Sequence, residues 1–253
     1  MILTISVFAY SVFPQFEREE FDVVYHIAAY AAEGLSHFIR NYNYQNNLIA
    51  TTNLITQSIR NGNVKKFVFT SSIAVYGSGR PPMTEDMEPL PEDPYGISKL
   101  ACEYDLKAAH AMFGLDYVIF RPHNVYGPGQ IRQGKMATVI GIFEDCFIKG
   151  KALPIVKPGT QSRRFTHIKD TVEVCFKAWK ANKCRYYSIS NNTSLTIIEV
   201  AKLFNSKIKY LSPRKGERYA SALSGMSLNN KVYKNLGKIQ LKDYIFEFLK
   251  KHT

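Results

Sequence analysis

The 253-residue sequence predicts an α/β fold, in which a parallel β-sheet is flanked by helices and a small C-terminal α/β part follows. Two observations predict it. Short apolar runs rich in Val, Ile, Phe and Tyr alternate along the chain with longer segments of helical periodicity, which is typical of β-α-β units. Hydrophobic residues make up 45% of the chain, enough for the core that such a sheet requires. We expect residues 1–150 to carry the sheet and residues 151–253 to form the C-terminal part.

The first elements lie before residue 62. Residues 21–29, with the sequence FDVVYHIAA, predict a buried strand, and residues 2–13 have a composition that favours a strand as well. His26 is interpreted as a core histidine with a satisfied hydrogen bond, because no second metal ligand lies nearby in the sequence. Residues 43–60 repeat apolar side chains at helical spacing, and Gly62 ends that helix.

The clearest chemical pattern follows. The apolar run 67–69 predicts a strand, and Ser72 comes at its carboxyl end, where open parallel sheets bind ligands. Pro94 suits the start of a helix, on which Tyr95 and Lys99 lie four residues apart and therefore share a face. A lysine ammonium beside a phenol favours the phenolate, so the spacing predicts a lowered pKa for Tyr95 and a role as general base or acid. Taken alone, this spacing is more often a surface tyrosine beside a solvated lysine.

The alternation continues through the second half. Residues 117–120 predict a strand that leads into the turn-rich segment 121–128, RPHNVYGP. Further elements are expected as a helix at 136–150, a polar segment at 159–170, a helix at 170–183, a strand at 186–189, and a helix that begins at Thr196 with a capping box to Glu199.

The trio Ser72, Tyr95 and Lys99 resembles the catalytic set of the short-chain dehydrogenase/reductase superfamily. The segments SSIAVYG, EDPYGISK and FRPHNVYGPGQ resemble its extended branch, the NAD-dependent epimerases and dehydratases of nucleotide sugars, and are most similar to UDP-glucose 4-epimerase-like members. The resemblance covers about residues 21–217. It implies a Rossmann-type sheet, NAD as cofactor, a UDP-sugar as substrate, and two parts interleaved into one compact unit.

The resemblance also implies the residues of the site. The catalytic residues would be Ser72, Tyr95 and Lys99. The cofactor would contact Ile27, Ala28, Ala29, Tyr30, Asn46, Tyr95, Lys99 and His123. The substrate would contact Ser72, Asn124, Arg163, Arg214 and Glu217. No metal is implied. At three places the residues by themselves also fit a purely structural role: Asn46 as a helix cap, the 121–128 segment as a plain turn cluster, and Arg214 with Glu217 as part of a basic turn.

One expected motif is absent from the sequence. The first glycine is Gly34, whereas a dinucleotide fold opens with a Gly-rich turn whose backbone N–H groups approach the cofactor pyrophosphate. About two strand–helix units of the family are missing, so we expect an incomplete Rossmann-type sheet and compromised NAD binding. The strand at 23–27 would become an apolar edge, which is an aggregation hazard. Residues 2–13 are a candidate substitute strand; a gene fragment or a covering partner are the alternatives.

Two positions distinguish the reactions of the family. The resemblance implies Asp-Glu directly after the active-site hydroxyl in 4,6-dehydratases, and a Glu there in decarboxylases; here Ile73 and Ala74 stand in those places and cannot exchange a proton. This favours 4-epimerisation of a UDP-hexose by transient oxidation at C4. The alternative is a truncated, catalytically inactive descendant, or a gene fragment, that retains sugar-nucleotide or partner binding.

Composition limits the remaining partners. The net charge of +12 is uneven, since residues 149–253 carry +16 and the rest −4. The lysines are dispersed and no nucleic-acid-binding motif is present, so no nucleic acid is expected. No apolar run reaches membrane-spanning length, the start lacks a signal-peptide pattern, and the four cysteines lack CxxC spacing; we therefore expect a cytoplasmic protein without a membrane role. A homodimer through helices 43–60 and 95–113 is left open.

Overall fold

The computed structural model describes residues 2–4, 13–77, 79, 83–178, 185–213, 215 and 238–252. The chain divides into two compact units. Unit 1 comprises Met1–Gly79, Met87–Arg121 and Cys175–Tyr187, and unit 2 comprises Arg80–Asp86, Pro122–Val174 and Ser188–Thr253. This division differs from the boundary expected at residue 150: residues 122–150 belong to unit 2, and 175–187 return to unit 1, because packing follows the sheet rather than the order of the sequence.

The sheet of unit 1 confirms the predicted α/β class. Its strand order is β1-β2-β3-β4-β9. The strands are β1 (Ile2–Thr4), β2 (Val23–His26), β3 (Lys66–Thr70), β4 (Tyr117–Pro122) and β9 (Arg185–Ile189). The first four are parallel, with Ile2 paired to Val23, Val23 to Lys66, and Phe67 to Tyr117. Strand β1 lies beside β2, where a substitute strand was expected; residues 5–12 lie outside the described part.

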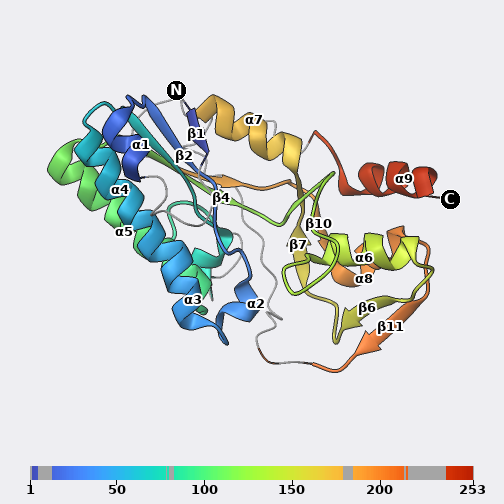
Figure 1. Ribbon diagram of the computed structural model, residues 1–253. Helices are drawn as coiled ribbons and strands as arrows, with labels where there is room; N and C mark the ends of the chain where they lie inside the picture. Colours follow the sequence, from blue (N-terminus) through green and yellow to red (C-terminus); the bar gives the residue numbers. More distant parts are fainter. Residues whose placement is uncertain are drawn as a thin grey trace. The chain divides into compact units, whose positions relative to one another are not determined.

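Helices flank this sheet (Figure 1). They are α1 (Phe13–Arg18), α2 (Glu33–Ser36), α3 (Arg40–Tyr44), a π-helical turn (Gln45–Ile49), α4 (Ala50–Asn61), a 3-10 turn (Ile73–Tyr76) and α5 (Pro94–Phe113). Gly62 and Gly114 end α4 and α5 in left-handed conformations, which glycine adopts without strain. The core lies between the sheet, α4 and α5, where Phe67, Leu54 and Leu106 are buried together. The helix α5 packs against the 3-10 turn that follows β3.

Unit 2 is built from short strands and an aromatic core. Its elements are β5 (Val125–Tyr126), α6 (Val139–Ile148), β6 (Leu153–Val156), β7 (Ser162–Arg164), β8 (Thr166–His167), β10 (Ser194–Thr196), α8 (Ile197–Leu203), β11 (Ile208–Leu211) and α9 (Leu241–His252), and α7 (Ile168–Ala178) runs from unit 2 into unit 1. The strands form the pairs β10-β7, β11-β6 and β5-β8. The predicted capping box is confirmed, since Thr196 and Glu199 bond reciprocally at the start of α8. The core of unit 2 buries Phe143, Phe204 and Phe248.

Two kinds of feature are absent from the described residues. None of their helices has the length and apolarity needed to cross a membrane. Among the same residues, no three His, Cys, Asp or Glu side chains gather as a metal-binding group.

Candidate functional site

The end of β3 and the start of α5 bring the predicted trio of unit 1 together. Lys99 Nζ donates a hydrogen bond of 2.7 Å to the carbonyl oxygen of Thr70, and it lies 5.9 Å from the centre of the Tyr95 ring. The Tyr95 hydroxyl has a hydrogen-bonding interaction with the side chain of Ser72. Three side chains that are up to 27 residues apart in the sequence therefore form one cluster, with Tyr95 and Lys99 on one face of α5.

Local backbone geometry holds this cluster. Ser72 is the N-cap of the 3-10 turn, and its Oγ accepts a hydrogen bond of 3.1 Å from the backbone N–H of Ala74. Asp93 caps α5 by accepting from the N–H of Gly96 at 2.9 Å. A Cβ atom on Gly96 would lie 2.6 Å from the carbonyl oxygen of Ala74. Glycine at this position therefore allows the first turn of α5 to contact the turn that follows Ser72.

The predicted lowering of the Tyr95 pKa is wrong for this structure. Burial raises the pKa of Tyr95 to about 12, and the interaction with Ser72 opposes that rise only in part. Burial also lowers the pKa of Lys99 to about 8. Lys99 directs its ammonium to the carbonyl oxygen of Thr70 and to the face of the Phe69 ring, 4.8 Å from the ring centre. The sequence spacing placed the two groups correctly but could not include the cost of burying them.

The amide predicted for cofactor contact, Asn46, and its neighbour Asn47 have different surroundings. Asn46 lies on the outer side of its helix and donates to the carbonyl oxygen of Tyr42 at 2.7 Å. Asn47, which is 2% exposed, instead accepts from the backbone N–H of Tyr30 at 2.7 Å and donates to its carbonyl oxygen at 3.1 Å. Asn47 also donates to Asn43 at 2.9 Å, and Asn43 donates to the carbonyl oxygen of Pro94 at 2.9 Å. This buried chain connects the loop after β2 with the start of α5.

Sequence reasoning missed Asn47, although a signal for it exists. Asn43, Asn47 and Thr51 recur every four residues, and all three are buried. The recurrence indicates a polar stripe on the inner face of the helix. The π-helical turn over Gln45–Ile49 lies at this point, and such turns occur often at functional sites.

The loop after β2 holds the other predicted cofactor residues of unit 1. Ile27 is 58% exposed, and Ala28, Ala29 and Tyr30 are half-buried, so this loop is open to a ligand. His26, just before it, is buried, with Nε2 2.8 Å from Thr51 Oγ1. Burial lowers the pKa of His26 to about 3, so it is neutral near pH 7. One ring nitrogen is thus satisfied as expected, while the buried Nδ1 has no partner among the described residues.

Two of the predicted substrate residues, Asn124 and Arg163, lie together in unit 2. Asn124 and Arg163 line a cavity of about 240 Å³ together with Val125, Thr138, Val139, Ile140, Gln161, Phe165 and Ile197. Asn124 has a φ of 39°, a left-handed conformation that asparagine tolerates better than most residues. Gln161 was missed by the sequence analysis; it stands two residues before Arg163, at the spacing that repeats one face of a strand. Arg214 and Glu217 lie outside the described residues.

His123 is completely buried in unit 2. Its Nδ1 lies 3.2 Å from Ser190 Oγ, and its backbone N–H donates to the carbonyl oxygen of Ile189 at 3.0 Å. Its ring is therefore oriented by neighbours of its own unit.

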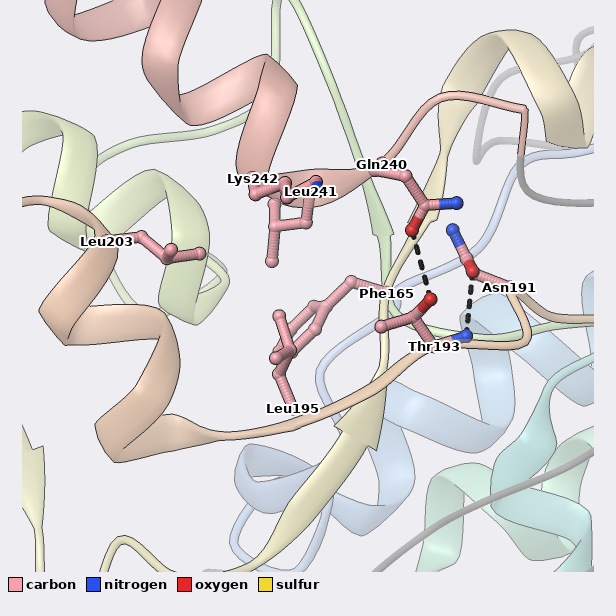
Figure 2. A pocket seen from close by; sticks show the side chains of 8 residues that line it. All are labelled: Phe165, Asn191, Thr193, Leu195, Leu203, Gln240, Leu241 and Lys242. Atoms are coloured by element: carbon pink, nitrogen blue, oxygen red, sulfur yellow. Dashed lines mark hydrogen bonds between the residues drawn. The ribbon is translucent and has the colours of Figure 1, made fainter.

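A second cavity of unit 2, of about 340 Å³, contains none of the predicted site residues in its lining (Figure 2). It is lined by Phe165, Asn191, Thr193, Leu195, Leu203, Gln240, Leu241 and Lys242. The Thr193 backbone N–H donates to Asn191 Oδ1 at 2.9 Å, and Thr193 Oγ1 donates to Gln240 Oε1 at 3.0 Å, as the dashed lines in Figure 2 show. Several of its polar groups thus already bond to one another.

Comparison with proteins of known sequence identifies relatives whose names give different activities. The human dTDP-D-glucose 4,6-dehydratase is 29% identical over 199 residues, which cover 77% of this chain and 55% of that protein. A putative UDP-glucose 4-epimerase of Methanocaldococcus jannaschii is 33% identical over 181 residues, which cover 68% of this chain and 58% of that protein. The chain thus spans little more than half the length of these curated relatives.

Solved structures and a family model agree on the family. The UDP-glucose 4-epimerase of Thermotoga maritima, solved with UDP-glucose, superimposes with a TM-score of 0.87 at 27% identity, covering 96% of this chain and 82% of that one. The model of the NAD dependent epimerase/dehydratase family matches residues 10–190, which is more than two thirds of the sequence. The strand-end serine, the Tyr-x-x-x-Lys helix and these matches together show that the chain belongs to the NAD-dependent epimerase/dehydratase family.

Proposed function

We propose that this chain acts as a nucleotide-sugar epimerase that inverts C4 of a UDP-hexose with NAD as cofactor. The observation that carries the proposal is the cluster of Ser72, Tyr95 and Lys99, followed by two residues that cannot exchange a proton, Ile73 and Ala74. Both are buried, at 7% and 0% exposure, so neither position offers the acid that dehydration requires. Besides the hydride exchange that NAD would supply, epimerisation at C4 requires proton transfer at one oxygen only.

Each residue of the trio has a defined task in this proposal. The Tyr95 hydroxyl oxygen takes the proton of the C4 hydroxyl and later returns it, while Ser72 Oγ hydrogen-bonds to the same C4 oxygen. Tyr95 is a neutral phenol at pH 7 in this structure, since its pKa is about 12. Its action as a base therefore requires a cation near its oxygen, and Lys99 is the buried cation on the same helix face. NAD, when bound, supplies the reversible acceptance of hydride from C4.

The residues of unit 1 fit one part of NAD better than the other. Tyr95, Lys99 and the open loop of residues 27–30 stand at the carboxyl ends of parallel strands, where a nicotinamide ribose would be held. For the pyrophosphate, the sequence has no glycine before Gly34 and no GxGxxG motif after it. We therefore expect weak NAD binding by this chain. His123, on unit 2, is proposed as a further nicotinamide contact.

The UDP-sugar is assigned to the cavity of about 240 Å³ in unit 2. Arg163 on its wall carries a planar guanidinium, which can donate two parallel hydrogen bonds to a diphosphate. Asn124 offers a short side-chain amide for the sugar. Its backbone carbonyl oxygen accepts a hydrogen bond of 3.3 Å from the N–H of Thr166, so a residue of the same unit holds Asn124 in place. Arg214 and Glu217 are proposed as further nucleotide contacts.

A second candidate is an inactive protein that binds the sugar nucleotide or a partner. The absent Gly-rich turn and the neutral Tyr95 favour it.

A homodimer through α4 and α5 is proposed for either candidate, since Tyr104, Met112 and Phe113 expose 53%, 76% and 64% of their surface on α5.

Calorimetric titration of the purified chain with NAD and with UDP-glucose tests the proposal, followed by an epimerase assay with Tyr95→Phe as control. Binding of both ligands, with turnover that Tyr95→Phe abolishes, supports the enzyme. UDP-glucose binding without NAD binding supports the inactive candidate. Failure of both ligands to bind, for a folded chain, would contradict the enzyme and the sugar-nucleotide-binding form of the inactive candidate.

A further inference from the structure

Glu103 is a buried carboxylate that none of the predicted roles uses. It lies on α5 one turn beyond Lys99 and two turns beyond Tyr95, so the three side chains follow one another on one face of the helix. Glu103 is 1% exposed. Its Oε1 accepts a hydrogen bond of 2.5 Å from Ser71 Oγ and one of 2.9 Å from Arg121 Nε, and its Oε2 accepts one of 2.5 Å from Arg121 Nη2.

This helix face holds three consecutive residues at the end of β3. Lys99 donates to the carbonyl oxygen of Thr70, and Glu103 accepts from the hydroxyl of Ser71. The side chain of Ser72 interacts with Tyr95. The backbone N–H of Ser71 also donates to the carbonyl oxygen of Phe120 at 2.7 Å, which ties the segment to β4. Ser71 is therefore fixed from two sides, and the direction of the next residue, Ser72, follows from it.

Arg121 anchors the carboxylate in turn. It stands near the end of β4, is 3% exposed, and places its guanidinium carbon 4.9 Å from the centre of the Tyr76 ring and 4.7 Å from that of Tyr186. A buried ion pair contributes little net stability, because desolvation of both charges offsets their attraction. Stability alone therefore does not explain why this pair is buried. Its use as a rigid acceptor for the Ser71 hydroxyl does explain it.

The same carboxylate also acts on Lys99. Burial lowers the pKa of Lys99, and the negative charge of Glu103 opposes this fall. Glu103 therefore favours the protonated lysine, the form that donates to Thr70.

We propose that Glu103, clamped by Arg121, is a positioning residue that fixes Ser72 against Tyr95 by holding the hydroxyl of Ser71. Its consequence for turnover depends on the proposed epimerase function; its consequence for the geometry of Ser72 does not. A merely structural ion pair would join α5 to β4 without any specific effect at Ser72.

The test is the variant Ser71→Ala, which removes the connection to Ser72 and leaves the ion pair in place. Ser58→Ala is the matched control, since Ser58 is also a buried serine of unit 1, 1% exposed, and donates one hydrogen bond of 2.8 Å to Leu54. The primary measurement is hydrogen exchange of the Ala74 amide, which donates to Ser72 Oγ, relative to the Phe67 amide, which donates to Asp116 in the sheet.

Ser71→Ala is expected to accelerate exchange at Ala74 about five- to tenfold relative to Phe67, because the acceptor is no longer held. Ser58→Ala should leave this ratio unchanged, and Ser71→Thr, which retains the hydroxyl, should restore it. Equal acceleration at Ala74 and Phe67 in Ser71→Ala, or no acceleration, would overturn the proposal.

Turnover supplies the second readout. If the wild-type chain is active, Ser71→Ala should lower kcat about tenfold and leave KM within about twofold, because the interaction acts at the reacting oxygen. A loss confined to KM would also overturn the proposal. An inactive wild type would contradict the proposed function instead, and the exchange ratio would still decide the role of Glu103.

Discussion

Each unit of the molecule buries a glutamate with an arginine partner, and the two pairs have different surroundings. In unit 1, the side chains of Arg121 and Glu103 are 3% and 1% exposed. In unit 2, Glu144 is completely buried, but the side chain of its partner Arg132 is 37% exposed. The carboxylate of the first pair also accepts from the hydroxyl of Ser71, at the end of a strand of the sheet. The second adds Gln130 and Tyr244, and so joins a loop, α6 and α9.

The comparison shows what a buried carboxylate does in each place. In unit 2 it connects elements that have little sheet to hold them together, around a core of aromatic side chains. In unit 1 the packing of the sheet against α5 already holds the elements together. There the carboxylate orients one hydroxyl, that of Ser71, beside the candidate catalytic residues. The predictions below compare the two units, beginning with the largest expected effect.

Removal of each carboxylate should separate the two pairs most clearly. Glu103→Ala leaves Arg121 charged and buried, and should lower the free energy of unfolding by about 3–5 kcal/mol. Glu144→Ala leaves an arginine that reaches water, so the loss should be smaller, about 1–3 kcal/mol. Urea denaturation followed by circular dichroism measures both. Equal losses would show that exposure of the arginine does not distinguish the pairs.

Acid should destabilise unit 1 through His26. Its pKa is about 3 in the folded chain, far below the ordinary value, so the unfolded state binds more protons below pH 6.5 and stability falls as pH falls. From pH 7 to pH 4.5 the loss should be about 2–3 kcal/mol. The matched residue of unit 2 is His167, whose pKa is lowered by burial, while the charge of Asp170 opposes this fall in part.

Urea denaturation of His26→Gln and His167→Gln at both pH values tests this prediction. His26→Gln should flatten the pH dependence more than His167→Gln. The same flattening in both variants would contradict a special role of the desolvated His26.

Two glycines permit close helix contacts, one in each unit. A Cβ on Gly96 would lie 2.6 Å from the carbonyl oxygen of Ala74, and one on Gly141 would lie 2.2 Å from that of Ile131. Gly96→Ala and Gly141→Ala should each cost about 1–3 kcal/mol of unfolding free energy. Only Gly96→Ala should also change hydrogen exchange at Ala74, because only this glycine contacts the turn after Ser72. A change at Ala74 in Gly141→Ala would remove that distinction.

The smallest effect concerns Lys99 at alkaline pH. Its folded pKa is about 8, below the ordinary 10.5, so between these values the unfolded state binds more protons and stability rises with pH. Between pH 8 and pH 9.5 the contribution should be about 1–2 kcal/mol. Lys99→Met should lack this rise in urea denaturation, whereas Lys149→Met, which removes an ammonium paired with Asp145 at 2.8 Å on α6, should retain it. A rise that persists in Lys99→Met would disprove the assignment.

The sequence by itself determined the features that depend on neighbours along the chain. Helix ends follow from single residues, as at Gly62 and Thr196, and their positions were predicted correctly. The shared face of Tyr95 and Lys99 follows from helical spacing, and the place of Ser72 follows from the end of an apolar strand. Each of these depends on spacing or on one backbone conformation, which a short stretch of sequence fixes.

Tertiary structure decided what depends on distant partners. The rise in the Tyr95 pKa comes from burial, which no local spacing shows. The side chain of Asn47 is buried and paired because the loop after β2, 17 residues away, bonds to the inner face of the helix. Glu103 has its function only because Ser71 and Arg121, 32 and 18 residues away, meet it in the folded chain. Desolvation and buried pairing are properties of the packed interior, so they arise only once the sheet has brought its strand ends together.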